Sequence, residues 1–268
     1  MLSTARVPVG KVVGHASRCE EDLLAVEEPL EIRLGRMSLS VTMRTPGDDF
    51  DLAAGFLFAE GIISSAKQIR RIQHASDGNP NIVVVDLSPD AVVKPVVVQR
   101  GFVMTSACGL CGKVSLEALE ANRCPLLPHS SLKIDPLVLH DLPDRLRREQ
   151  AVFENTGGLH AAALFNADGE LQSLREDVGR HNAVDKLIGQ ALLNSRIPLR
   201  DSVMLVSGRA SFELVQKALM ASIPMLAAVG APSSLAVSTA MRCGMTLVGF
   251  LRNGRFNIYS GSSCIAGL

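Results

Sequence analysis

The sequence predicts a mixed α and β protein, with a β-rich first half and an alternating α/β second half. Short runs of β-branched residues, separated by turn residues, dominate the first half. In the second half, apolar strand-like runs alternate with helical segments at the spacing of right-handed βαβ units. A chain of 268 residues can bury one large core or two modest ones.

The first half is expected to hold short strands and one clear helix. A polar lead-in precedes two apolar runs on either side of the Gly35-Arg36 turn, and two β-branched runs follow later. Leu52, Phe56 and Ala59 share one face of a helix that ends at Gly61. The expected strands are residues 30–34, 39–44, 82–87 and 92–99, the helix is 52–60, and a further helix-like segment is 114–121.

The second half is expected to alternate between strands and helices. Ser211 and Ser233 are suitable helix N-caps, and Asn253-Gly254 is a tight-turn pair. The expected strands are residues 161–165, 171–174, 202–206, 224–229, 245–251 and 256–259, and the expected helices are 182–193, 212–221 and 235–243.

A proline-rich stretch over residues 124–143 is the expected joint between two domains. The predicted division is a β-rich N-terminal domain over residues 1–130 and an α/β C-terminal domain over 131–268. The sequence contains no internal repeat and no low-complexity tract.

Composition argues against several classes of protein. The 27 basic and 27 acidic residues balance, whereas a nucleic-acid binder with a broad phosphate footprint is usually basic. No apolar run reaches the roughly eighteen residues of a spanning helix, and the first residues do not resemble a signal peptide. The six cysteines are scattered except for one close pair, unlike a secreted disulfide framework. We therefore expect a cytoplasmic protein that binds neither nucleic acid nor membrane.

The cysteine pair is the strongest chemical signal. Cys108 and Cys111 enclose Gly109-Leu110, with Lys113 just behind them. Small neighbours leave both thiols reachable, and a lysine and a following helix start can lower a thiol pKa. These features suit a nucleophilic cysteine that carries sulfur as a persulfide.

Three alternatives compete with sulfur transfer at this pair. The thiols can be idle loop residues, or two of four zinc ligands together with Cys124 and His129. A thioredoxin-like disulfide exchanger is the third alternative, although it would carry a βαβ context around the pair. The spacing alone does not decide among them.

Arginines recur beside glycines in the inferred loops of the second half. Arg209 follows a strand just before a helix, and Arg252 and Arg255 flank a tight turn that could clasp a diphosphate. Solvated loop arginines are the ordinary alternative. The loop arginines are Arg175, Arg180, Arg209, Arg252 and Arg255.

Two histidine segments also stand out. His181 lies in a polar cluster over residues 177–186, where Asp177 can cap a helix, Asp185 and Lys186 can lie on its solvated face, and His181 can be a core residue. His160 resembles the first residue of the zinc deaminase His-x-Glu motif. However, Ala162 replaces the glutamate and no Pro-Cys-x-x-Cys follows.

Taken together, these segments resemble the FdhD family of formate dehydrogenase accessory sulfurtransferases. The most specific blocks are TSACGLCGK at 105–113 and EDVGRHNAVDKLIG at 176–189. Four other segments match in order: residues 52–63, 157–163, 207–217 and 247–259.

The resemblance implies a function and a site. Family members take sulfur from a cysteine desulfurase and pass it to the molybdenum or tungsten bis-pterin guanine dinucleotide cofactor of formate dehydrogenase. On this basis Cys108 carries the persulfide, Cys111 assists it, and the second domain has a cytidine-deaminase-like three-layer fold without zinc. The cofactor-binding residues implied or proposed are Phe250, Leu251, Arg252, Asn253, Gly254 and Arg255, with Arg180, His181 and Arg209.

The cofactor's two similar halves predict a two-fold symmetric homodimer, and no resident metal is expected. The alternative function is a non-catalytic chaperone that binds the cofactor and docks it onto formate dehydrogenase.

Overall fold

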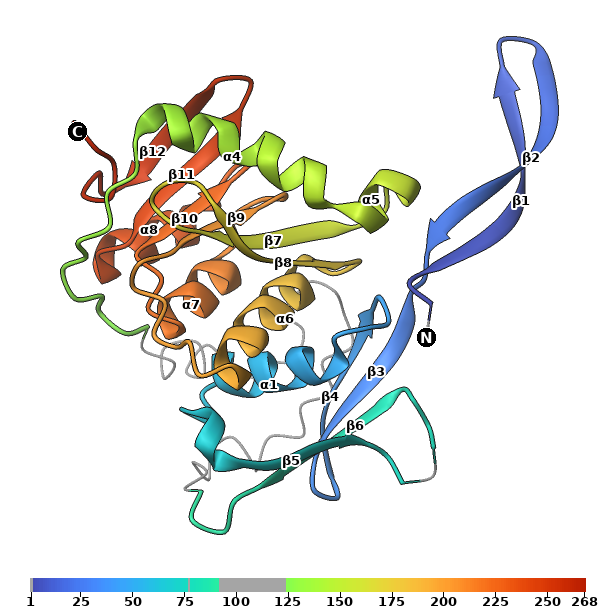
Figure 1. Cartoon of the computed structure of the whole chain (residues 1–268), viewed down its shortest axis with the longest axis horizontal. Helices are drawn as coiled ribbons and strands as arrows, with labels where there is room; N and C mark the ends of the chain where they lie inside the picture. Colours follow the sequence, from blue (N-terminus) through green and yellow to red (C-terminus); the bar gives the residue numbers. More distant parts are fainter. Residues whose placement is uncertain (1, 77, 92–123) are drawn as a thin grey trace.

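The computed structural model describes residues 2–76, 78–91 and 124–268. The strand expected over 92–99, the helix-like segment 114–121 and both residues of the cysteine pair lie outside these ranges. Helices and strands are both abundant within them, and the expected mixed α and β class is confirmed (Figure 1).

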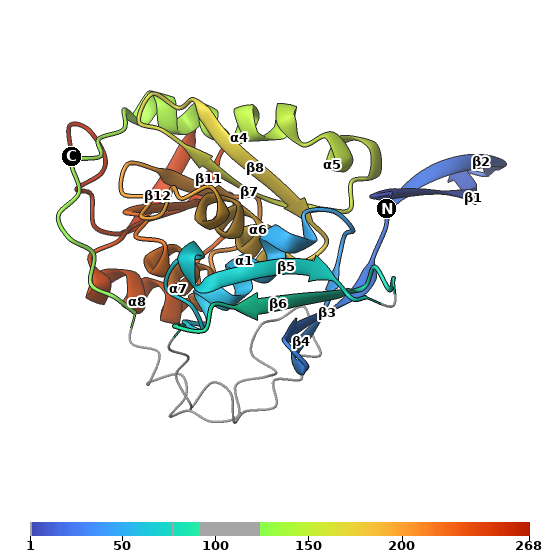
Figure 2. The ribbon, with the colours of Figure 1, turned by 60° about the horizontal axis from the view of Figure 1, so that its bottom comes forward.

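The first half contains a four-stranded sheet with one helix on it. Its strand order is β4-β3-β6-β5, in which β3 pairs in parallel with β6 and the other pairs are antiparallel. Helix α1 lies between this sheet and helix α6 of the second half (Figures 1 and 2). The bounds are β3 Glu28–Leu34, β4 Met37–Arg44, α1 Asp49–Ala59, a 3-10 turn at Ala66–Gln68, β5 Ile69–His74 and β6 Ile82–Leu87.

The second half contains a six-stranded sheet in the order β12-β11-β10-β9-β7-β8. Strands β9, β10 and β11 are parallel, whereas β7, β8 and β12 each run antiparallel to a neighbour. The bounds are β7 His160–Phe165, β8 Leu171–Asp177, β9 Val203–Val206, β10 Met225–Ala228, β11 Thr246–Arg252 and β12 Arg255–Ser260.

Helices cover both faces of this sheet, as expected for a three-layer arrangement. Along β7, Ala162 and Leu164 belong to the larger core, and Ala163 and Phe165 belong to the smaller core on the opposite face. The larger core includes α6 Arg180–Leu193, α7 Phe212–Met220 and α8 Ser234–Cys243, whereas the smaller core includes α4 Pro136–Glu149, which α5 Ala151–Thr156 follows.

The larger core also joins the two halves. It extends from Leu30 and Leu57 of the first half to Ile188 of α6. Helices α1 and α6 are in backbone contact, because a Cβ at Gly55 would overlap the carbonyl of Asp185, and one at Gly189 would overlap the carbonyl of Asp51. The division at residue 130 stays a prediction.

The expectation of a joint over 124–143 is wrong for its second part, which forms the start of α4. Asp135 caps this helix by accepting a hydrogen bond from the Leu137 amide at 2.7 Å, and Pro136 occupies a first-turn position where no N–H is needed. Leu139, Leu142 and Leu146 are buried at helical spacing. Here proline marks the beginning of a helix and not a linker.

The sequence patterns also did not predict two antiparallel, polar elements, the β1–β2 hairpin and strand β5. The lead-in forms a hairpin, β1 Thr4–Val13 and β2 Ala16–Ala25, which projects from the body of the molecule (Figure 1). Its side chains are largely exposed, so no apolar pattern announces it. Strand β5 is an edge strand with Arg70 and Arg71 exposed, a composition typical of sheet edges.

Candidate functional site

The candidate site lies at one end of the six-stranded sheet. Because β9, β10 and β11 are parallel, the segments that follow them emerge at the same edge. Backbone bonds join these segments: the Gly230 amide donates to Gly208 O at 2.9 Å, and the Phe250 amide donates to Gly230 O at 3.0 Å. The antiparallel strands β7 and β8 begin and end at this edge, at His160 and Asp177 respectively.

Glycines at the strand ends let polar side chains approach one another. A Cβ at Gly208 would lie 3.5 Å from His160 Nδ1 and 4.0 Å from Arg180 Cδ, and a Cβ at Gly230 would lie 3.2 Å from Arg209 Cα. Two of the predicted arginines, Arg180 and Arg209, thus belong to neighbouring segments of one edge. The buried Arg180 Nε has no hydrogen-bond partner among the described residues.

Residues 250–255 comprise the end of β11, the Asn253-Gly254 turn and the start of β12, at the same edge. Asn253 and Gly254 both have positive φ, as the tight hairpin turn predicted for this pair requires. Arg252 and Arg255 face each other across the hairpin and are exposed, as an anion-binding role requires.

The first two residues of this segment are placed differently. Leu251 is fully buried in the smaller core and offers no surface to a ligand. Phe250 also has positive φ, an uncommon conformation for a bulky residue, and its ring lies 5.6 Å from the guanidinium carbon of Arg252. The irregular backbone at Phe250 coincides with a register shift between β11 and β12.

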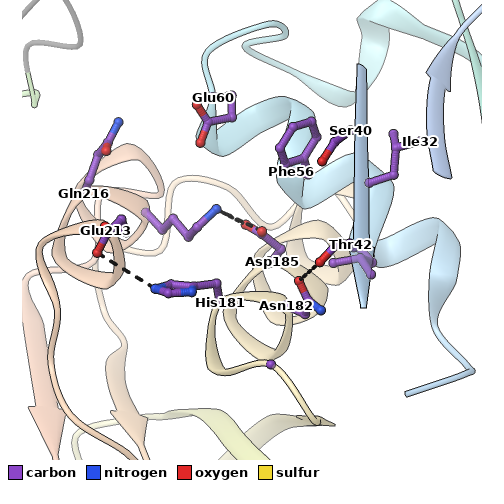
Figure 3. Close-up of a pocket in the computed structure, with 13 residues that line it drawn as sticks. Ile32, Ser40, Thr42, Phe56, Glu60, His181, Asn182, Asp185, Glu213 and Gln216 are labelled. Atoms are coloured by element: carbon purple, nitrogen blue, oxygen red, sulfur yellow. Dashed lines mark hydrogen bonds and ion pairs between the residues drawn. The ribbon is translucent and has the colours of Figure 1, made fainter. Parts of the chain in front are cut away.

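His181 lies in a different place from the arginines. It lines a pocket bounded by α1, the β3–β4 hairpin and the starts of α6 and α7 (Figure 3). Its Nε2 lies 3.4 Å from Ser211 Oγ and 3.9 Å from the Glu213 carboxylate. Since Gly179 and His181 line this pocket while Arg180 approaches His160, the first turn of α6 separates the pocket from the sheet edge.

A buried ion pair forms one wall of the His181 pocket. Lys217 Nζ donates to both carboxylate oxygens of Asp185, at 2.7 and 2.9 Å (Figure 3). Burial raises the pKa of Asp185 to about 6, although the charge of Lys217 opposes the shift. The same surroundings, chiefly the Asp185 charge acting against burial, leave the pKa of Lys217 above its usual value.

The polar residues around His181 form the framework that attaches β4 to α6. Asp177 is fully buried, accepts the Gly179 amide at 2.8 Å and pairs with Lys186 at 2.8 Å. Lys186 also donates to Thr45 O at 2.8 Å. The suggestion that Asp185 and Lys186 lie on a solvated face is wrong, because both are almost fully buried. Burial raises the pKa of Asp177, against the influence of Lys186.

Arg175 is held by acidic residues. Its guanidinium lies 2.9 Å from Asp51 and 3.3 Å from Asp48, both at the start of α1. Unlike the other arginines considered above, Arg175 therefore attaches α1 to β8 and does not face a ligand site.

His160 faces a cavity of about 490 Å³ at the same edge of the sheet. Burial, followed by the nearby charge of Arg180, lowers the pKa of His160. Three further polar residues line this cavity, Arg147, Gln150 and Ser207, and sequence analysis identified none of them. No motif predicted them as site residues, and Arg147 and Gln150 belong to α4 and its C-terminus, a stretch beyond residue 143 to which the sequence analysis assigned no element.

The predicted sulfur carrier, Cys108, and its partner Cys111 lie outside the described residues. Among the described cysteines, Cys19 is an exposed free thiol, and Cys243 and Cys264 are buried free thiols. Over residues 2–76, 78–91 and 124–268 no group of three or more His, Cys, Asp or Glu side chains is arranged to hold a metal ion. Across the same ranges, no helix has the length and apolar character needed to cross a membrane.

A sequence profile of the FdhD/NarQ family matches residues 25–266, nearly the whole chain. The chain belongs to the FdhD/NarQ family. A relative from Streptomyces coelicolor, named sulfur carrier protein FdhD, is 52% identical over 270 residues, covering 98% of this chain and 96% of its own. A relative of the same name from Sulfolobus acidocaldarius is 43% identical, with 97% of each chain covered.

The fold is shared with a solved structure. A chain from Desulfotalea psychrophila, described as a formate dehydrogenase accessory protein, superimposes with a TM-score of 0.77 at 26% identity. The alignment covers 98% of this chain and all of that one. The FdhD resemblance drawn from the motifs is therefore confirmed.

Proposed function

We propose that this FdhD-family chain is a sulfur carrier for the maturation of formate dehydrogenase. It accepts sulfur from a cysteine desulfurase in the cytoplasm and delivers it to the molybdenum or tungsten bis-pterin guanine dinucleotide cofactor. The observation that carries the cofactor role is the group of four arginines at one edge of the sheet. The names of the relatives support the sulfur chemistry.

The sulfur transfer is assigned to Cys108. Its thiolate attacks the outer sulfur of the desulfurase persulfide, so that the donor S–S bond breaks, a new S–S bond forms at Cys108, and the donor cysteine leaves as a thiolate. In the delivery step, Cys111 attacks the inner sulfur of Cys108, and the outer sulfur leaves as sulfide toward the cofactor. The two cysteines are then oxidised to a disulfide, which a cellular dithiol reductant must reduce before the next cycle.

The cofactor is bound as substrate through its phosphates. Arg252 and Arg255 are exposed on either side of the hairpin turn, and Arg180 and Arg209 belong to adjacent segments of the same edge. Guanidinium groups are well suited to phosphate because they are always charged and can donate two parallel hydrogen bonds. A cofactor with two guanine dinucleotide arms would be held by two copies of the edge, which favours a homodimer.

Intact-mass measurement tests the carrier. After incubation with a cysteine desulfurase and cysteine, the wild-type protein should gain one sulfur atom and Cys108→Ala should not. Cys19→Ala is the matched control, because Cys19 is an exposed free thiol on the projecting hairpin. A Cys108→Ala protein that gains sulfur as the wild type does would refute the assignment.

Titration with GDP tests whether Arg252 and Arg255 bind the phosphates of the cofactor. Arg252→Ala/Arg255→Ala should weaken GDP binding by about tenfold or more, since even one charge-assisted contact contributes roughly 1.5–3 kcal/mol. Arg242→Ala removes an exposed arginine of α8 and should bind as the wild type does. Equal affinity in both variants would exclude the turn from the binding site.

The chaperone alternative makes a different prediction. Cells in which Cys108 and Cys111 are both replaced by alanine should lack formate dehydrogenase activity if the chain transfers sulfur. Full activity in these cells would favour a role in cofactor binding alone.

A further inference from the structure

The β1–β2 hairpin is a two-stranded ribbon whose outer edges carry no further strand. Ten residues of β1 pair with ten residues of β2, from Thr4 opposite Ala25 at the base to Val13 opposite Ala16 at the tip. Within the described part of the chain, neither strand pairs with any other, and the ribbon projects from the body (Figure 1). A hairpin alone is marginally stable, whereas sheets of three or more strands can be stable. The ribbon would therefore gain stability from an added strand.

The two outer edges differ in their capacity to bind a strand. Strand β1 contains Pro8, which has no N–H, and Gly10, which weakens a strand. A proline within a sheet places its nitrogen on the side away from the ladder, so β1 lacks a donor at its outer edge. Strand β2 contains neither proline nor glycine and keeps all of its backbone donors and acceptors. An added strand is therefore expected at β2.

The charges along β2 change sign from the tip of the hairpin toward its base. Arg18 lies near the tip, and Glu20, Glu21 and Asp22 follow it toward the base. Arg18 pairs with Glu20 within the chain, but its side chain is still 68% exposed and is available to a further acidic group. If β2 of a second copy runs antiparallel to it, the basic end of each strand meets the acidic segment of the other. Strand β2 is therefore complementary in charge to itself.

Two-fold symmetry and charge together determine the register of such a pair. Facing side chains lie on the same side of a sheet, so a two-fold antiparallel pair is centred on one residue that faces its own copy. Arg18 faces Glu20 of the second copy when the pair is centred on Cys19. It faces Asp22 of the second copy when the pair is centred on Glu20, but two Glu20 carboxylates then oppose each other, which is destabilising. Only the register centred on Cys19 gives Arg18 an acidic partner without facing like charges.

We propose that β2 binds β2 of a second copy of this chain, so that two hairpins form a four-stranded sheet with its two-fold axis at Cys19. Residues 16–22 of each copy face one another, with an Arg18–Glu20 contact on either side of the axis. The tip of each hairpin, where Val12 and Val13 are 67% and 70% exposed, then lies beside the base of the other hairpin. This inference goes beyond the proposed function, which favours a homodimer without assigning its interface.

Oxidation of the natural cysteine tests the register. Cys19 is an exposed free thiol, and facing residues of an antiparallel pair have Cα atoms about 4.5–5.5 Å apart, within the range of a disulfide. Diamide takes up two electrons and two protons from a pair of thiols and leaves an S–S bond. It should join two copies of the full chain through a Cys19–Cys19 disulfide, identified as a cross-linked peptide by mass spectrometry.

The matched control moves the thiol along the same strand. In Ser17→Cys/Cys19→Ser the new thiol is two residues closer to the tip and is also at an exposed position. Its two copies would lie four residues apart along the paired strands, or about 13 Å, which is too far for a disulfide. This variant should not cross-link. Equal cross-linking at positions 17 and 19 would overturn the register, and the absence of a Cys19 cross-link would overturn the pairing.

Charge reversal tests the contact between the copies. Arg18→Glu and Glu20→Arg each place like charges opposite one another at both contacts. Each variant alone should therefore dimerise about tenfold or more weakly than the wild type in sedimentation equilibrium. Arg242→Glu, a reversal at an exposed position of α8, should dimerise as the wild type does. Circular dichroism establishes that each variant is folded.

Mixing the two reversed variants separates contacts between copies from the Arg18–Glu20 pair within each chain. In the mixed dimer both contacts between copies again join opposite charges, although the pair within each chain stays broken. The mixture should therefore associate as the wild type does. A mixture that associates no better than either variant alone, an unchanged dimer in Arg18→Glu, or a monomeric wild type would overturn the inference.

The tests of the proposed function are independent of these outcomes. Sulfur loading of Cys108 and GDP binding at Arg252 and Arg255 are measured on single chains and do not involve the hairpin. If the hairpins do not pair while both of those measurements succeed, the interface inference fails and the sulfur carrier role stands.

Discussion

The Asp185–Lys217 pair is a buried charge pair whose balance depends on pH. Both groups are almost fully enclosed by α1, α6 and α7, and Glu60 and Glu213 add negative charge nearby. For Asp185 the cost of burial exceeds the attraction of Lys217, so the carboxyl binds its proton more tightly in the folded state than in the unfolded chain. Stability is then linked to pH through this group.

The direction of the linkage follows from the raised pKa of Asp185. Between the ordinary pKa of about 3.8 and the folded value of about 6, the folded state holds more protons than the unfolded state. The stabilising contribution of Asp185 is therefore complete below pH 4 and is lost as the pH rises to 6. Urea unfolding at a series of pH values should show the wild-type advantage over Asp185→Asn decreasing across this window. A constant difference from pH 4 to 7 would contradict it.

Replacing Lys217 should raise the pH range over which Asp185 loses its stabilising contribution. In Lys217→Met the carboxyl keeps its burial but loses its closest positive charge, so its pKa should rise above 6. The free energy of unfolding should then continue to fall above pH 6, where the wild type has levelled off. The same urea titrations measure this, and a Lys217→Met curve parallel to that of the wild type would show that the pair is not coupled.

Individual site residues were predictable from the sequence where a local pattern forced their geometry. Asn253-Gly254 predicted the turn between Arg252 and Arg255, and strand ends followed by glycine predicted the position of Arg209. Adjacent residues on a helix always point in different directions. The sequence could not predict that His181 faces the pocket beside α1 while Arg180 approaches His160, because this depends on which elements pack on each side of α6. Gln150 had no signal at all, since its burial depends on α4 and on strand ends distant in the sequence.

At the scale of elements, the contact between α1 and α6 determines how the two sheets meet. Gly55 and Gly189 allow the backbones to touch, and no side chain could be inserted at either position without displacing a helix. The close contact between α1 and α6 also places Asp51 near enough to pair with Arg175, and this pair attaches α1 to β8.

Gly55→Ala should destabilise the protein strongly. The added methyl group would overlap the Asp185 carbonyl, which is backbone and cannot rotate away, so the cost should reach about 3 kcal/mol. Gly10→Ala is the matched control, because a Cβ at Gly10 meets nothing within 4 Å. Urea unfolding of both variants measures the difference. Equal stability of the two would mean that the helices do not approach this closely in solution.

Most elements could be predicted because their burial follows one simple period. The strands of the six-stranded sheet are short apolar runs, and α7 begins within a residue of its expected start. The elements that were missed include β5 at a sheet edge, the exposed β1–β2 hairpin, the short helix α5, and α4, whose prolines suggested a break. Tertiary burial of Leu139, Leu142 and Leu146 outweighs the prolines in α4.

At the scale of the whole molecule, the body and the projecting hairpin are distinct in character. The two sheets and their helices share the larger core, whereas β1 and β2 pair with each other and meet the body near α5, where Ala25 lies beside Gly158. A two-stranded hairpin gains little stability by itself.

Deleting residues 2–25 should therefore leave the body folded, with a change in unfolding free energy below about 1 kcal/mol. Urea unfolding of the truncated and full-length chains measures this, and sedimentation equilibrium of both chains tests the predicted homodimer. A loss of several kcal/mol would show that the hairpin is needed for folding of the body.

The hairpin has a consequence for self-association. No third strand among the described residues borders β1 or β2, so both margins of the ribbon carry backbone groups able to accept an added strand. The charged side chains of Arg6, Lys11, Glu20 and Glu21 are paired and hydrated, and charged residues of this kind oppose such growth. Replacing these four residues with uncharged ones should allow the ribbon to act as a nucleus for fibrils.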